Sequence, residues 1–203
     1  MPKEVIENPL PAVIAAVQLP SVSDDEFKVS IAELRELAKT LGFKVVRTFI
    51  QKRAGFDRTG YLGVGKRQEI SRFVSDGIEP GDDSELNDAV PAAVSLDGEA
   101  IEVLLVDHEI SPSQARNLEL EVGCEVMDRT MVILEIFHRN ARSRAARAQV
   151  EIARLGYMAP RMREAAKLAG PQGRQRSGLG GRGAGESATE MDRRKIRDRI
   201  AEL

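Results

Sequence analysis

The chain has 203 residues, of which 42% are hydrophobic and 31% are charged, a balance typical of a globular protein with one domain or one domain and an appendage. It contains no apolar run near the roughly 20 residues that a membrane span needs, and its first residues lack the apolar core of a signal peptide. A single cysteine, Cys124, excludes an internal disulfide and suits a reducing compartment, so we expect a cytoplasmic protein without a metal-binding cluster.

The net charge of −2 conceals two parts of opposite sign. Residues 129–203 contain 17 lysines and arginines against 8 acidic residues, whereas residues 1–128 contain 13 against 24. A basic part of this kind indicates a surface that faces a polyanion. The alternative, that the arginines only solvate exposed helices, fits the charges equally well.

The first 128 residues alternate strand and helix signals. Four strands are predicted, over residues 12–19, 43–51, 101–107 and 124–127. The first of them is a continuous apolar run, as in a strand that is buried on both faces. Ser23 and Ser111 open capping boxes that begin two helices, and a further helix is predicted near 66–76. This order predicts an α/β fold with a small parallel sheet flanked by helices and joined by right-handed crossovers.

Residues 77–100 interrupt the alternation with seven acidic residues and no basic one. We interpret this stretch as an acidic, flexible insertion at the surface, because it has few apolar side chains to bury. The α/β subdomain would then comprise residues 1–128.

Residues 129–203 are rich in arginine and predict a long antiparallel hairpin of two helices. The first helix is expected from about Thr130 to Ala169, with a bend or an end at Pro160, and the second over 186–203. Residues 170–185 connect them and contain seven glycines, three arginines and no acidic residue. Because about 30 helical residues extend about 45 Å, the hairpin would hold this glycine-rich tip far from the sheet.

The glycine-rich loop 170–185 is the candidate RNA-binding site. Glycine lets the backbone approach a partner closely, and arginine presents a planar charged fork to phosphates and to splayed bases. The residues assigned to this site, including two arginines of the preceding helix, are Arg174, Arg176, Gly178, Gly180, Gly181, Arg182, Gly183, Arg161 and Arg163. The alternative is a flexible linker with incidental charge.

A second candidate site, for an anion or a nucleotide, consists of Gly60, Gly63, Gly65 and Lys66. Their spacing is that of a phosphate-binding loop, G-x-x-x-x-G-K, but Arg67 replaces the serine or threonine that would bind Mg²⁺. A tight turn into a helix is the simpler interpretation.

The triplet Asp107-His108-Glu109 follows the predicted third strand, at the edge where open α/β sheets place ligands. A carboxylate beside a histidine can transfer protons, but no nucleophile is spaced to pair with it. A turn before a capped helix explains the triplet more simply. We therefore predict no catalytic residue and no metal ligand.

Several segments resemble the HflX family of GTPases. Residues 180–187 and 190–200 resemble the glycine-rich loop and the second helix of that family. Further matches occur in the family's order over residues 61–66, 109–118, 128–130, 133–137 and 156–161. Together they cover nearly the whole chain and are specific, although each alone is weak. Ala184 stands where the family usually has proline, and Ser187 where threonine is common.

The resemblance implies an N-terminal α/β subdomain, a helical hairpin and then a GTP-binding domain. It also implies a protein that binds the large ribosomal subunit, promotes ribosome dissociation and aids recovery from stress, with loop 170–185 reaching the ribosomal RNA near the peptidyl-transferase region. The sequence lacks a complete phosphate-binding loop, switch regions and a guanine-reading motif. We therefore expect a fragment that binds no cofactor itself and has its own C-terminal G domain as a partner, with GTP and Mg²⁺ used only by that domain.

Two other functions remain open from the sequence. One is a stand-alone ATP- or GTP-binding domain that uses the segment from Gly60 to Lys66. The other is a protein-interaction module that regulates the G domain, with RNA binding incidental.

Overall fold

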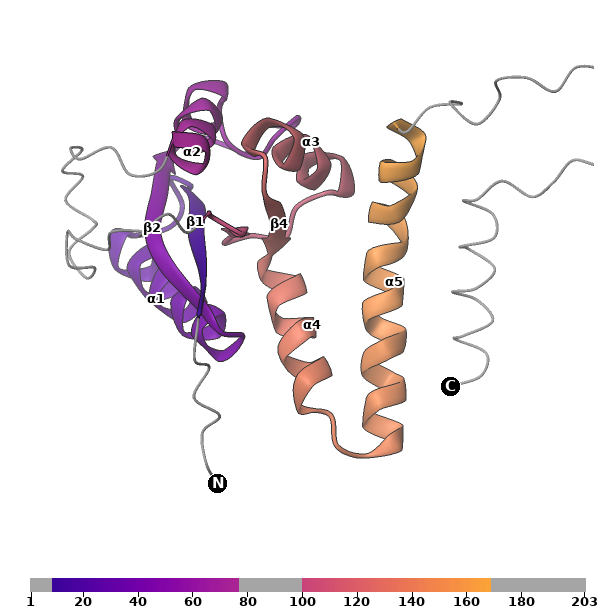
Figure 1. The fold of residues 1–203 in the computed structure, drawn as a ribbon. Helices are drawn as coiled ribbons and strands as arrows, with labels where there is room; N and C mark the ends of the chain where they lie inside the picture. Colours follow the sequence, from indigo (N-terminus) through magenta and orange to yellow (C-terminus); the bar gives the residue numbers. More distant parts are fainter. Residues whose placement is uncertain (1–8, 77–99, 169–203) are drawn as a thin grey trace, which may run out of the picture. The chain divides into compact units, whose positions relative to one another are not determined.

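A computed structural model describes residues 9–76 and 100–168 (Figure 1). The chain divides into two units, one ending at Ile136 and the other beginning at Phe137. Most of the predicted insertion, the glycine-rich loop 170–185 and the second predicted helix of the hairpin lie outside the described residues.

The first unit is built on a parallel sheet with the strand order β2-β1-β3-β4. The strands are β1 (Leu10–Gln18), β2 (Phe43–Lys52), β3 (Val103–Val106) and β4 (Glu125–Asp128). Every residue of β1 after Leu10 is buried, because this strand lies inside the sheet with helices on both faces. The predicted small parallel sheet flanked by helices is confirmed.

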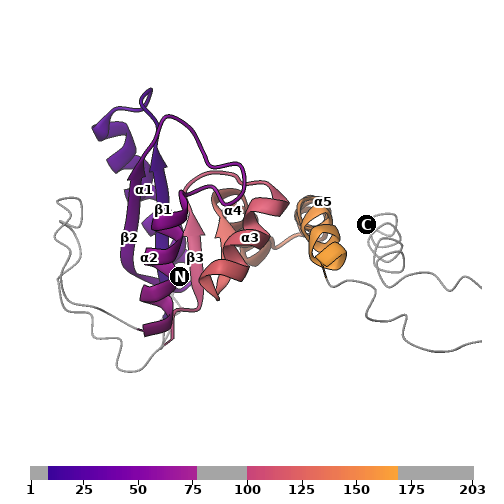
Figure 2. The same ribbon diagram turned by 90° about the horizontal axis from the view of Figure 1, so that it is seen from above.

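Three of the described helices cover this sheet: α1 (Asp24–Thr40), α2 (Val64–Asp76) and α3 (Pro112–Val122). Helices α2 and α3 pack beside each other on the face that carries Val13 and Val17 (Figure 2). Helix α1 lies on the opposite face, where Arg35 donates to the hydroxyl of Thr48 in β2 at 2.8 Å. Both predicted capping boxes are formed, and they begin α1 and α3.

The remaining described helices are α4 (Arg129–Asn140), which runs from the first unit into the second, and α5 (Arg144–Leu168). The sequence predicted one helix with a bend or an end at Pro160. Instead, the helix is interrupted at residues 141–143, and α5 continues through Pro160. The hydroxyl of Ser143 accepts the amide of Ala146 at 3.0 Å and so caps the start of α5. In a helix, the ring of a proline crowds the carbonyl four residues earlier. For Pro160 that carbonyl belongs to Gly156, which has no side chain to add to the crowding.

Within the described ranges, no helix is both long and apolar enough to cross a membrane.

Candidate functional site

The carboxyl ends of β1 and β3 meet where the strand order reverses, which is the usual ligand position in an open α/β sheet. Tyr61, from the loop between β2 and α2, joins these two ends. The amide of Val17 donates to its phenolic oxygen at 3.0 Å, and Nδ1 of His108 lies 2.8 Å from the same oxygen. Burial raises the pKa of Tyr61 well above its ordinary value, so the phenol keeps its proton.

The bonds of Tyr61 indicate the tautomer of His108. The backbone amide can only donate, so the Tyr61 oxygen accepts there. Nδ1 of His108 is the other group bonded to this oxygen among the described residues, and we therefore assign the phenolic proton to that bond. A neutral His108 then carries its proton on Nε2. Burial lowers the pKa of His108, an effect that the charge of Asp107 opposes and that of Arg129 reinforces. The neutral ring is therefore the favoured form near pH 7.

Asp107 is buried and binds Arg129. Its Oδ1 lies 2.9 Å from Nη2 of Arg129, and the hydroxyl of Ser30 donates to both carboxylate oxygens at 3.0–3.1 Å. Arg129 also donates to Glu33 at 2.9 Å. The negative charge of Asp107 is thus compensated within the protein, and the acid–base pair considered for residues 107–109 is replaced by a structural network.

Asp128, at the end of β4, fixes the start of α4. It is fully buried, and its carboxylate accepts the amide of Met131 at 2.9 Å and the amide of Ile110 at 3.2 Å. Sequence reasoning noticed Asp128 and Arg129 only as part of a family resemblance. The pair of Arg129 with Asp107 and the bond of Asp128 to the amide of Ile110 join residues that are far apart in the sequence, so no local spacing motif indicates them.

The loop that imitates a phosphate-binding motif is closed by its own hydrogen bonds. Five consecutive amides donate to protein oxygens: Thr59 and Gly60 to the carboxylate of Asp57, Tyr61 to the carbonyl of Asp57, Leu62 to the carbonyl of Gly60, and Gly63 to the side chain of Gln51. In a phosphate-binding loop, such amides bind the phosphate. The two amide bonds of Asp57 are also the main reason why its pKa is lowered, so this loop holds a negative charge.

The cations of this segment are likewise engaged. The side chain of Arg67 is only 6% exposed and pairs with Glu121 on α3 and with Asp57, whose oxygen lies 3.3 Å from Nη1. Lys66 pairs with Glu69 at 2.7 Å. A Cβ at Gly60 would lie 2.7 Å from Cδ of Arg67, which gives this glycine a packing reason. Arg67 is therefore a structural residue at the position where a phosphate-binding loop would have a Mg²⁺-binding hydroxyl.

Among the described residues, no group of three or more histidine, cysteine, aspartate or glutamate side chains is arranged to hold a metal ion.

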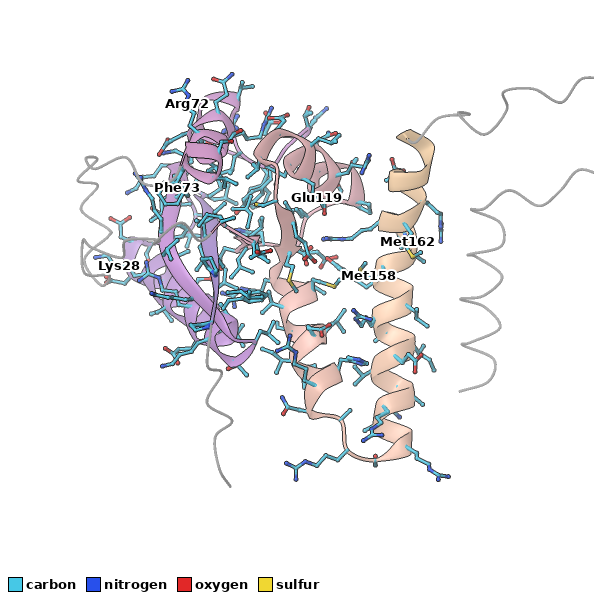
Figure 3. The ribbon with its side chains drawn as sticks, viewed as in Figure 1. Lys28, Arg72, Phe73, Glu119, Met158 and Met162 are labelled. Carbon is cyan, nitrogen blue, oxygen red and sulfur yellow. The ribbon has the colours of Figure 1, made fainter. Side chains whose placement is uncertain are left out.

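Of the predicted RNA-binding residues, the structure describes Arg161 and Arg163, both in α5. Arg163 is exposed, and the guanidinium of Arg161 lies 5.2 Å from the ring centroid of Tyr157. Three more exposed arginines precede them, Arg142, Arg144 and Arg147. Figure 3 shows the side chains along α5, with Met158 and Met162 labelled. The assigned residues Arg174, Arg176, Gly178, Gly180, Gly181, Arg182 and Gly183 lie outside the described residues, so their contact with RNA stays a prediction.

Two family profiles match the chain: GTP-binding GTPase N-terminal over residues 28–138, and GTP-binding GTPase Middle Region over residues 140–203. The GTPase HflX of Gluconacetobacter diazotrophicus is 46% identical over 96% of this chain and 45% of the relative. That of Alkalihalophilus pseudofirmus is 38% identical over 89% of this chain and 37% of the relative. The Escherichia coli GTPase HflX is 42% identical over 57% of this chain and 26% of the relative. The chain therefore spans less than half the length of these relatives.

Among solved structures, a GTP-binding protein from the hyperthermophilic archaeon Sulfolobus solfataricus in complex with GDP resembles the chain with a TM-score of 0.54 and 22% identity. The likeness covers 96% of this chain and 44% of that protein, and it shows the fold. Because the two family profiles together match residues 28–138 and 140–203, the chain belongs to the HflX family of GTPases, whose N-terminal and middle regions it matches.

Proposed function

We propose that this chain is the ribosome-binding part of an HflX-type GTPase. In this proposal it binds the large ribosomal subunit, promotes ribosome dissociation under stress, and contacts ribosomal RNA through loop 170–185. GTP and Mg²⁺ would be used by a C-terminal G domain, which is a partner of these residues.

Family membership together with the charge of residues 129–203 carries this proposal. That part has 17 basic against 8 acidic residues. Its described arginines between Arg144 and Arg163 extend over about 29 Å of helix, at 1.5 Å per residue. Three of these arginines, Arg144, Arg147 and Arg163, are exposed, and exposed guanidinium groups suit the phosphates of an RNA backbone.

The loop from Gly60 to Lys66 gives no support to a stand-alone nucleotide-binding function. The amides of residues 60–63 donate to protein oxygens, and the following Arg67 is buried against acidic residues. We propose instead that the first unit is a rigid docking body to which the basic part is attached.

Co-sedimentation with purified ribosomal subunits tests the proposal. The chain should pellet with large subunits, and changing Arg174, Arg176 and Arg182 together to alanine should reduce the pelleted fraction several-fold, because three phosphate-pairing charges are lost. The matched control changes three exposed cations of the first unit to alanine and should pellet like the parent. They are Lys44 and the two residues labelled in Figure 3, Lys28 and Arg72.

Two results would contradict the proposal in different ways. A loop variant that pellets like the parent would show that loop 170–185 is not the RNA contact. A parent chain that pellets with neither subunit would favour the protein-interaction module instead.

A further inference from the structure

We propose that Phe56 and His108 form a stacking site for an unpaired RNA base at the carboxyl edge of the sheet. The inference rests on the proposed RNA-binding function, but it concerns a different surface, in the first unit. No residue of this surface was assigned to RNA binding from the sequence.

The ring of Phe56 is held in place but remains exposed. Its centroid lies 4.7 Å from that of His108 and 5.2 Å from that of Tyr61, yet 39% of the residue is accessible to solvent. Phe56 thus rests on two aromatic rings and still offers aromatic surface outside the core. Unpaired RNA bases stack on exposed aromatic side chains of this kind, with little dependence on sequence.

His108 adds a hydrogen-bond donor beside this ring. Because Nδ1 accepts the phenolic proton of Tyr61, Nε2 carries the proton of the neutral imidazole. Among the described residues, no acceptor is bonded to this N–H group. Base edges carry carbonyl oxygens and ring nitrogens that can accept from it.

Two exposed cations lie within four residues of Phe56 in the sequence. Arg58 is exposed and has no bonded partner within the described residues, and Lys52 forms only an exposed pair with Asp24 at 3.0 Å. Exposed pairs of this kind are weak, so Lys52 can exchange its partner for a phosphate. Both cations are therefore available to pair with RNA phosphates.

Two acidic groups of this edge are compensated within the protein. Asp57 is bound by two loop amides and lies near Arg67, and Asp107 is bound by Arg129. Glu109 is the exposed acid of the triplet.

A partner protein would be expected to bind a wider apolar patch. The other strongly exposed apolar side chains of the helices around the sheet include Val29 on α1, Val64 at the start of α2 and Leu120 on α3. Helices α1 and α3 cover opposite faces of the sheet, so Val29 and Leu120 do not form one patch. An aromatic ring with one donor and two cations fits a base with its phosphates better than it fits an apolar protein surface.

Photo-crosslinking locates the site directly. A short single-stranded RNA that contains 4-thiouridine is bound to the chain and irradiated, and the adduct is mapped by mass spectrometry. The adduct is expected within residues 53–63 or at His108, both in the parent and in the variant with Arg174, Arg176 and Arg182 changed to alanine. Persistence in that variant separates this inference from the function proposed for loop 170–185.

Binding of a fluorescein-labelled RNA of ten nucleotides, followed by anisotropy in the same triple variant, measures the contribution of stacking. Phe56→Ala should weaken binding by about 5- to 100-fold, as for loss of one base–aromatic stack, and Phe56→Trp should restore it. Leu120→Ala removes a more exposed apolar side chain of the same unit and should leave binding unchanged. The free energy of unfolding of each variant, measured with urea, shows that the unit remains folded.

The inference is overturned if Phe56→Ala binds like the parent, or if no adduct forms within residues 53–63 or at His108. It is also overturned if a mononucleotide competes as well as the ten-nucleotide RNA, because the site would then take a free nucleotide. Loss of ribosome binding without loss of this adduct would contradict only the function proposed for loop 170–185.

Discussion

Single residues determine the loop between β2 and α2, and Tyr61 does so from a strained backbone conformation. Its φ of 64° lies in the left-handed region, which costs a residue with a bulky side chain of order 1–3 kcal/mol. Burial of the ring and the two hydrogen bonds of the hydroxyl offset this cost. The strain places the phenol at the reversal point of the sheet, where it joins β1 to His108.

Tyr61→Phe keeps the ring but leaves the amide of Val17 and Nδ1 of His108 without their partner. We expect the free energy of unfolding to fall by about 1–3 kcal/mol, the usual penalty for unpaired buried polar groups. Tyr157→Phe, at the chain's other tyrosine, is the matched control. It should change stability less, because the bond that Arg161 donates to that hydroxyl is long, at 3.4 Å, and only partly buried. Urea denaturation measures both, and equal stability of the two variants would contradict this role of Tyr61.

His108 predicts a pH dependence of stability. Its folded pKa is lowered by burial, so the unfolded chain takes up a proton more readily. The free energy of unfolding should therefore be constant above the unfolded pKa of about 6.5 and should decrease as the pH falls below it. Urea denaturation between pH 7.5 and 5.5 measures this slope. His108→Gln should remove it, whereas His138→Gln, at the second of two histidines, should retain it. An unchanged slope in His108→Gln would contradict the prediction.

At the scale of elements, Arg67 joins α2 to the preceding loop and to α3. Its guanidinium reaches Asp57 and the carbonyl of Leu62 in the loop, and Glu121 in α3. Together with the amide bonds to Asp57 and Gln51, this side chain closes a segment that has the spacing of a phosphate-binding loop.

Arg67→Ser completes the signature G-x-x-x-x-G-K-S, but the amides of residues 59–63 still donate to protein oxygens. We expect no Mg²⁺-dependent binding of GTP or ATP in calorimetric titrations, and a loss of about 2–4 kcal/mol in stability because Asp57 loses a buried partner. Arg72→Ser, at an exposed position of the same helix, should be nearly neutral. Saturable nucleotide binding by the Arg67→Ser variant would show that the loop can open.

The elements differ in how well their sequences predict them. The strands and the capping boxes at Ser23 and Ser111 were predictable, because apolar runs and caps are local signals. The break before Ser143 was not, since a single serine cap is less conspicuous than Pro160. The positions of Tyr61 and Arg67 depend on partners 44 and 54 residues away, Val17 and Glu121, which no local pattern indicates.

The whole molecule combines an acidic and a basic part. Residues 1–128 have 24 acidic against 13 basic residues, and residues 129–203 have the opposite excess. Residues 129–203 should attract a polyanion, whereas the net negative charge of residues 1–128 should weaken the binding of RNA to the first unit away from its local cations. Asp128 and Arg129 lie at the change of sign, and their bonds fix the first turn of α4 to the sheet.

The salt dependence of affinity for purified large ribosomal subunits tests the central proposal most directly. The logarithm of the association constant should fall linearly with the logarithm of the salt concentration. In the variant with Arg174, Arg176 and Arg182 changed to alanine, the slope should be shallower by about 2–3, because three fewer counterions are released. Equal slopes for the parent and this variant would contradict RNA contact by loop 170–185.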